Sequence, residues 1–207
     1  MQTSSIAAKG FLNIGSSLVD DVIYGTVGGD EKIVTAFFDG VTVGSTYSAF
    51  GLGAISVKYM IGGTFGSLLT FDVDAQSRTK MVEAVVLDTH LNTNWTTGAN
   101  NGTVLVFCTS GDKDLYGGLH VTSLSTSLCT ISAVIAANSS SGYTVSNPNG
   151  TTRITFTAQS CKDGTFATPV SGGTLSTDQP FYRSVITVST GSGSGGVARG
   201  VIYMGIE

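Results

Sequence analysis

Short runs of β-branched and aromatic residues recur along the chain, and each ends at Gly, Asn or Asp before the next begins. Such runs are typical of strands joined by tight turns. Residues 151–159 alternate regularly, with Thr155 and Thr157 on one face and Ile154 and Phe156 on the other, so one face should meet a core. The pattern predicts strands over roughly 19–27, 31–38, 41–49, 54–61, 67–73, 80–88, 103–109, 118–124, 129–137, 142–146, 151–159, 181–190 and 196–206.

The turns between these runs have a stereochemical basis. Asp39-Gly40 separates two runs by two residues, the spacing at which Asp-Gly supplies the positive φ angles of a type I′ hairpin. Pro148, Asn149 and Gly150 are expected to turn the chain in a similar way, and Asn101-Gly102 and Asp163-Gly164 are weaker examples. The glycine-rich tract 191–196 is interpreted as the flexible tip of a hairpin between 184–190 and 197–204.

The spacing of strands and turns predicts an all-β fold, an antiparallel β-sandwich or barrel, with a jelly roll among its forms and at most one short helix. The best helix candidate is 74–87, where Asp74 could cap, but apolar residues in its second half alternate, so a strand competes. The length favours a single β-rich domain over 1–207, with the termini at about 1–18 and 191–207 as candidate arms.

Composition narrows the function classes. Hydrophobic residues make up 41% of the chain, which excludes intrinsic disorder, and charged residues only 12%, about half the usual share. The net charge is −4 and the basic residues are scattered singly, so nucleic acid is not an expected partner. The N-terminus lacks the pattern of a secretory signal, and no apolar run reaches the length of a membrane helix, so no membrane association is predicted.

Candidate chemistry is sparse. Cys108, Cys129 and Cys161 are far apart and odd in number, which favours buried free thiols over a disulfide framework or a zinc site. Glycines in 191–196 match the dinucleotide fingerprint, but no helix is expected to follow, so no cofactor is predicted. His90 or His120 could act as the base of a hydrolase, with Asp88 on the same strand face as His90. No G-x-S-x-G elbow supports that hypothesis, and no catalytic residue is assigned.

Paired carboxylates at Asp72 and Asp74, and at Asp112 and Asp114, project to one side of a strand, where two acids can share a cation. Neither pair completes a calcium loop, so a solvated acidic edge is the simpler interpretation and no metal site is predicted.

The single tryptophan supplies the one candidate interaction site. Trp95 lies in a polar segment, NTNWTTGANNG, where it could stack on a sugar or insert into a neighbouring subunit, with Asn94 and Asn100 beside it. The alternative is that Trp95 folds back over the end of a sheet as a lid on the core.

A charge-poor surface on a many-stranded domain has two explanations: Ser, Thr and Asn cover it, or neighbouring subunits do. Across its whole length the Gly-, Ser- and Thr-rich composition resembles that of bacteriophage and viral structural proteins such as capsid subunits, decoration or cement proteins and tail components. The resemblance implies a homo-oligomeric virion protein that binds copies of itself and other virion subunits. A carbohydrate- or receptor-binding module, such as a tail-fibre tip, is the first alternative, and a serine/histidine hydrolase the second.

Overall fold

All the regular elements that the structure describes are strands, so the all-β prediction is confirmed. The structure is a computed structural model, and it describes residues 4–11, 32–37, 41–44, 49–63, 70–77, 81–107, 114–125, 129–139, 150–160, 166–167, 170–174, 178–190 and 195–206. In this part of the chain there is no helix long and apolar enough to cross a bilayer.

Contacts along the chain define two compact units. Unit 1 consists of Met1–Val34 and Leu52–Met81, and unit 2 of Thr35–Gly51 and Val82–Glu207. The description of 1–207 as one domain with arm-like termini stays a prediction.

Unit 1 contains an antiparallel sheet in which β4 (Thr70–Ser77) lies between β1 (Ser4–Phe11) and β3 (Ala49–Gly62). Phe71, Ala75 and Ser77 on β4 are buried, and Gln76 between the last two is exposed, as alternation along a strand requires. Ile6 and Met81 pack against Ala75.

The first sheet of unit 2 is built around β14 (Val197–Ile206), which pairs with β5 (Val82–Thr96) on one side and β8 (Asp114–Leu124) on the other. Further pairing to β8 comes from β11 (Phe166–Ala167) and β12 (Val170–Thr174). Ala49–Gly51 at the start of β3 adds to β5 at Val82–Ala84, and β2 (Lys32–Phe37) pairs with β3.

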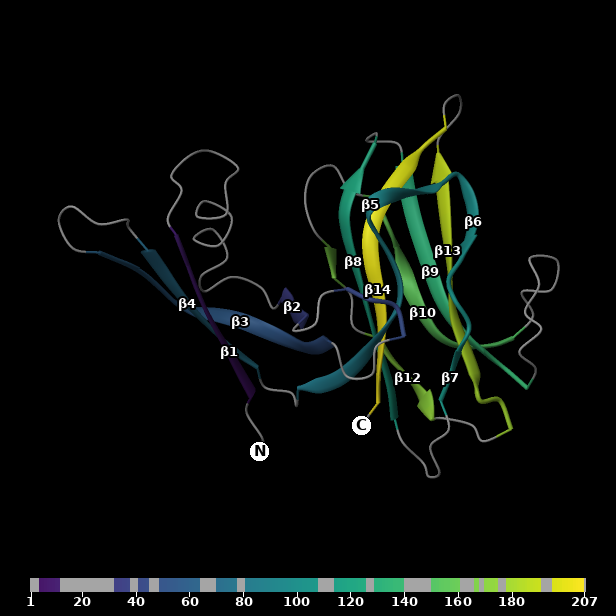
Figure 1. The fold of residues 1–207 in the computed structure, drawn as a ribbon, viewed down its shortest axis with the longest axis horizontal. Helices are drawn as coiled ribbons and strands as arrows, with labels where there is room; N and C mark the ends of the chain where they lie inside the picture. The colour runs from purple at the N-terminus through teal and green to yellow at the C-terminus, as the bar shows by residue number, and fades with distance from the viewer. Residues whose placement is uncertain are drawn as a thin grey trace. The chain divides into compact units, whose positions relative to one another are not determined.

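The second sheet of unit 2 has the order β10 (Thr151–Gln159), β9 (Cys129–Asn138), β13 (Phe181–Thr190) and β6 (Gly98–Asn101), with β7 (Leu105–Val106) also on β13. Figure 1 shows this sheet facing the β5–β14–β8 sheet. The strands predicted over 151–159 and 181–190 are confirmed at both ends.

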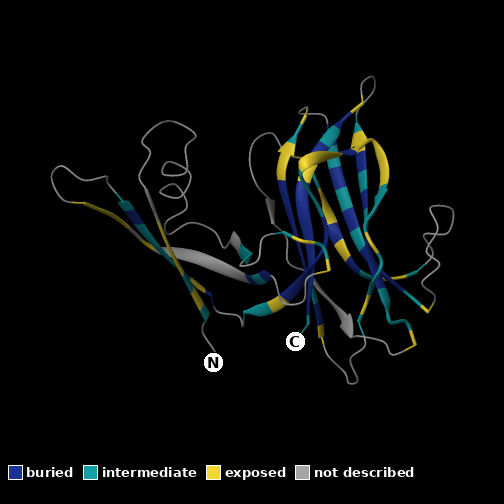
Figure 2. Ribbon diagram, viewed as in Figure 1, coloured by how far each residue is buried: buried dark blue, intermediate teal, exposed yellow. Residues whose placement is uncertain are grey.

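The main core fills the space between the two sheets, and Figure 2 shows many buried positions along the strands of both. Leu119 and Ile202 from one sheet, and Ile135, Phe156 and Ile186 from the other, belong to one cluster. Gly117 lets β8 approach closely, because a Cβ there would lie 2.8 Å from the Phe156 ring. Of the two predicted architectures, this packing is that of a sandwich.

Two local predictions are wrong, and one open choice is decided. Over 74–87 the competing strand forms in place of the candidate helix: 74–77 belong to β4 and 82–87 to β5, because alternation outweighs local helix propensity. The predicted strand 41–49 does not form over 41–44, where Gly44 N–H instead donates to the Val86 carbonyl at 2.9 Å. The tract 191–196 does not join a hairpin, since β13 and β14 lie in different sheets.

Other predictions have mixed outcomes. Residues 197–206, offered as part of an arm, lie here as β14 with a partner on each side. Asn101 ends β6, and Gly102 N–H donates to the Ser184 carbonyl at 3.0 Å. The predicted strands 118–124 and 129–137 form within β8 and β9. Some predictions lie outside the described residues: strands 19–27 and 142–146, Asp39-Gly40, Pro148-Asn149, and Asp163-Gly164.

Candidate functional site

The segment that holds all three predicted interaction residues includes a large irregularity in β5. Trp95 pairs with Ala198 of β14 and His90 with Gly200, so residues 91–94 stand opposite the single residue Arg199. We call residues 91–94 the β5 bulge. Asn92, Thr93 and Asn94 are exposed, whereas Leu91 is partly buried against the cluster on the outer face of the sheet. Bulges of this kind occur often beside functional sites, where they redirect side chains.

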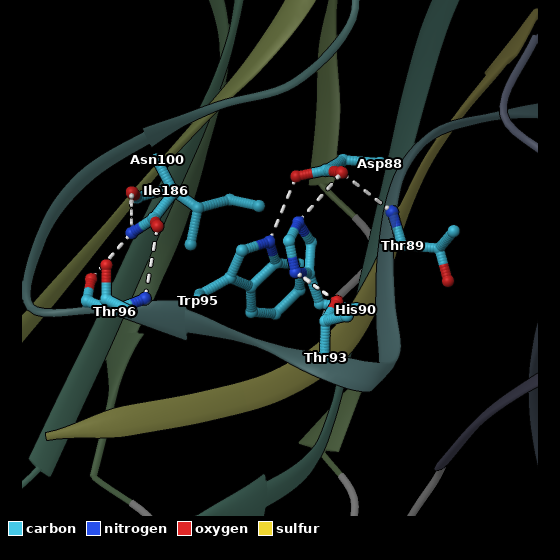
Figure 3. A network of polar contacts seen from close by, with 8 residues as sticks. All are labelled: Asp88, Thr89, His90, Thr93, Trp95, Thr96, Asn100 and Ile186. Atoms are coloured by element: carbon cyan, nitrogen blue, oxygen red, sulfur yellow. Dashed lines mark hydrogen bonds and ion pairs between the residues drawn. The ribbon is translucent and has the colours of Figure 1, made fainter.

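Asp88, which precedes the bulge, is hydrogen-bonded to Trp95, which follows it. Trp95 Nε1 donates to Asp88 Oδ2 at 2.9 Å, and Thr89 N–H donates to Asp88 Oδ1 at 2.8 Å (Figure 3). The Trp95 side chain is fully buried in the main core, so it is the core lid of the sequence analysis and presents no ring face to solvent. The polar neighbours of Trp95 do not expose it, because Asp88 satisfies its indole N–H inside the protein.

His90 lies between a carboxylate and a hydroxyl. Its Nδ1 is 2.7 Å from Thr93 Oγ1, and its Nε2 is 3.6 Å from Asp88 Oδ1. This order of groups is that of a hydrolytic triad, but the contact to Asp88 is longer than a hydrogen bond. Asp88 is engaged by the indole and by Thr89, and the Thr93 bond closes the bulge. The geometry therefore supports a structural role for His90.

The two predicted asparagines have different positions. Asn94 is exposed, and its Oδ1 accepts a hydrogen bond from Arg199 Nε at 2.8 Å. Asn100 organises the turn between β5 and β6: its Nδ2 donates to the carbonyls of Thr96 at 2.7 Å and Gly98 at 3.1 Å, and its Oδ1 accepts from Thr96 N–H at 3.1 Å. Only Asn94 of the three predicted residues thus presents its side chain on the surface of the bulge.

His120 belongs to a second polar cluster, on the outer face of the β5–β14–β8 sheet. Its Nε2 lies 2.6 Å from Thr35 Oγ1, and the Thr35 hydroxyl lies 2.9 Å from the Tyr203 hydroxyl. Burial lowers the pKa of His120 to about 4 and raises that of Tyr203 to about 12, although the hydrogen bond from Thr35 opposes the second shift. These three residues are 85 and 168 positions apart, so no spacing in the sequence could have indicated the cluster.

The carboxylate pair on β4 is already matched by lysines. Lys9 Nζ lies 3.5 Å from Asp72 Oδ2, and Lys58 Nζ lies 3.6 Å from Asp74 Oδ2. Asp112 lies outside the described residues, and Asp114 is exposed. No group of three His, Cys, Asp or Glu side chains that could hold a metal occurs among the residues for which coordinates are described.

The prediction of a buried free thiol is confirmed for one of the three cysteines. Cys129 is free and buried, and burial raises the pKa of its thiol. Cys108 and Cys161 lie outside the described residues.

The surface of unit 2 is poor in charge. Thr, Ser, Asn and Gly make up most of the exposed residues that are described. The charged residues among them are Glu83, Asp114, Asp178 and Arg199. We call these exposed residues together the charge-poor surface. It includes Thr151, Thr152, Thr155 and Thr157 of β10, which is the edge strand of its sheet in the described part of the chain.

No protein-family model and no curated protein matches the chain. Solved structures that are similar to it come from infectious bursal disease virus. A chain of the Gx strain is 10% identical with a TM-score of 0.39, and one of the Gt strain is 12% identical with a TM-score of 0.34. A chain of the VP2 subviral particle is 12% identical with a TM-score of 0.30.

These matches cover 97% to 98% of this chain and 55% of each solved chain. The chain therefore spans about half the length of the structures it resembles.

Proposed function

We propose that the chain is a structural subunit of a virus or bacteriophage particle, of the capsid or decoration type, and that it acts by binding copies of itself and other virion subunits. Its place is the virion, and it has no catalytic role. The observation that carries the proposal is the charge-poor surface of unit 2. The cores of protein–protein interfaces are depleted in charged residues. A protein that stays monomeric, by contrast, gains solubility from charged residues on its surface.

The β10 edge supports the proposal as one contact region. Its exposed positions are four threonines and Ala158, and Arg153 is its one charged residue. Edge strands that must avoid association normally carry outward charges. The ladder to β9 is irregular between Thr152 and Ile154 and between Phe156 and Gln159. A strand from a neighbouring subunit could therefore pair with only a short stretch of β10. This favours contact between subunits through the threonine side chains.

The β5 bulge supports the proposal as a second contact region. Asn94 is held by Arg199 and the bulge is closed by the contact between His90 and Thr93, so little conformational entropy is left to lose on binding. Trp95 contributes from inside by anchoring the chain directly after the bulge, and Asn100 holds the turn that follows β5. With Trp95 buried, the sugar-stacking face of the carbohydrate-binding alternative is not available.

Charges placed on β10 test the contact region. We expect the double variant Thr152→Lys and Thr155→Lys to weaken self-association at least about tenfold, measured by sedimentation velocity, because each ammonium would be desolvated in the contact. Both sites are exposed, so thermal stability should change little. Thr42→Lys, at an exposed site away from β10, is the matched control and should associate like the wild type. Equal association of all three proteins would count against β10 as a contact.

A further inference from the structure

In the described part of the chain, β1 is the edge strand of the unit 1 sheet, and β4 is the one strand that pairs with it. All of Ser4–Phe11 pairs with β4 without a register shift, so the strand carries no bulge. Its exposed residues come from both faces: Ser5, Ala7 and Lys9 from one, and Ala8 from the other. The strand is therefore regular and accessible, as a strand that accepts a further partner must be.

β1 lacks the features by which sheet edges usually avoid association. Edge strands are commonly blocked by proline, by a bulge or by outward charges. β1 contains no proline, and Lys9 is its one charged residue. The Lys9 ammonium lies 3.5 Å from Asp72 Oδ2 on the neighbouring strand, so its charge is already balanced within the chain. A second strand could thus pair with β1 without leaving an unmatched charge.

One face of the unit 1 sheet is charged but balanced. The register places Lys9 of β1 and Lys58 of β3 on the same face as Asp72 and Asp74 of β4, and we call this the charged face. The ion pairs Lys9–Asp72 and Lys58–Asp74 match two positive charges with two negative ones. Two copies of this face can therefore lie side by side without net repulsion.

The opposite face of the same strands is apolar. It carries Ile6, Ala8, Val73 and Ala75, and we call it the apolar face. Ile6 lies opposite Ala75 and packs against it, and Ala8 lies opposite Val73. A strand added beyond β1 must present apolar residues on this face to continue the pattern.

The sequence of β1 meets this requirement itself. When two β1 strands run antiparallel with Ala7 opposite Ala7 of a second copy, every residue faces one from the same side of the sheet. Ile6 then lies opposite Ala8, so the apolar face continues from one copy to the other. Ser5 lies opposite Lys9 on the charged face.

The charged face favours the same register. With Ala7 at the centre, the two Lys9 side chains are four residues apart along the strands, or about 13 Å. A pair centred on Lys9 would set two ammonium groups against each other, which destabilises an antiparallel pair. A pair centred on Ala8 would place Ile6 opposite Gly10, which has no side chain to contact it.

We propose that β1 is an assembly edge, at which two copies of the chain join their unit 1 sheets through an antiparallel β1–β1 pair centred on Ala7. Main-chain hydrogen bonds supply the affinity of such a pair, and the match of the apolar and charged faces sets its register. The contact is symmetric about a two-fold axis. The inference rests on the self-association that the proposed function requires, and it adds a contact in unit 1 to those proposed for unit 2.

Disulfide trapping in the whole chain tests the pairing. Directly opposite Cβ atoms in an antiparallel pair lie about 4.5–5.5 Å apart, close to the separation that a disulfide spans. Under mild oxidation, Ala7→Cys should give at least about tenfold more disulfide-linked dimer than Ala8→Cys on a non-reducing gel. Ala8→Cys is the matched control, because Ala8 is also exposed but would lie about 7–8 Å from its own copy. The oxidised wild type gives the background from the native cysteines.

A mixture of two variants tests the register. Ser5→Cys and Lys9→Cys should form disulfide-linked dimers when they are mixed, at least about tenfold more than either protein alone, because only the mixture brings the two thiols opposite each other. The Lys9–Asp72 ion pair is exposed, so its loss in Lys9→Cys should cost little stability. If Ala7→Cys does not fold, the mixture decides the question by itself.

Equal linking of Ala7→Cys and Ala8→Cys, or no excess of dimer in the mixture, would overturn the pairing. If the wild type assembles in sedimentation velocity while Ala7→Cys forms no disulfide above background, the β1 pairing is refuted and the proposed function stands. A strictly monomeric wild type, with no disulfide in any variant, refutes both.

Discussion

Close ring packing on the outer face of the β5–β14–β8 sheet depends on single residues that lack a side chain. Gly118 and Gly51 border the Tyr203 ring, and that ring in turn contacts His120 and Phe37. Protein interiors are packed so densely that even one added methyl group must displace its neighbours. The cost of a substitution at these glycines is therefore set by the rigidity of Tyr203, which is buried on all sides.

Gly118→Ala should lower the free energy of unfolding by about 2 kcal/mol, because the new methyl group would collide with the Tyr203 ring. Gly195→Ala is the matched control: a Cβ there meets nothing within 4 Å, so the change should stay within about 0.5 kcal/mol. Urea unfolding followed by circular dichroism measures both. Equal stability of the two variants would show that Tyr203 can move aside.

The burial and the hydrogen-bond partners of individual polar side chains were the hardest features to predict from sequence. The segment around Trp95 is polar, yet the ring is buried because Asp88, seven residues earlier, lies across the bulge to accept its N–H. Burial of Cys129 was predictable, since a lone thiol in a strand behaves as a small apolar residue. Thr35, His120 and Tyr203 come from three strands, so only the fold brings them together.

At the scale of elements, β5 performs two tasks along one continuous strand. Residues 84–88 are all buried, because the main core lies on one face, and Phe37, Val41 and Val43 pack on the other. Beyond them the strand passes through the bulge and then turns into β6 of the opposite sheet. Asn100 holds that turn through three backbone groups of residues 96 and 98, and Gly98 in it has a φ of 103°.

Asn100→Ala should therefore destabilise unit 2 by about 1–2 kcal/mol, since it leaves several backbone groups of the turn without their partner. Asn92→Ala, in the exposed part of the bulge, should change stability by less than about 0.5 kcal/mol. Thermal unfolding of both variants provides the measurement. A larger loss for Asn92→Ala than for Asn100→Ala would contradict this account of the turn.

Alternation predicted strands well where one face is buried and the other exposed, as in β10. It could not say which strands pair. The run after 191–196 resembles the second half of a hairpin, but β14 joins the other sheet, because pairing is decided by burial across the whole sandwich. Nor could it foresee that β5 would continue through a polar segment, since a bulge breaks the period on which the prediction depends.

At the scale of the whole molecule, the structure shows where the charge-poor surface that the composition indicated is located. In unit 2 it extends over the exposed face of β10 and over the β5 bulge, and hydroxyl and amide groups dominate both regions. Such groups can make hydrogen bonds to a neighbour without the desolvation cost that buried charges carry. Composition could predict a surface with few charges, but only the fold could place that surface on particular strands.

Sedimentation velocity of the purified wild-type protein over a range of concentrations, with negative-stain microscopy of the same samples, tests the central claim most directly. The account predicts concentration-dependent assembly into closed, regular oligomers or larger particles. A protein that remains strictly monomeric at the highest concentration, and that binds no shell of assembled virion subunits, would contradict it.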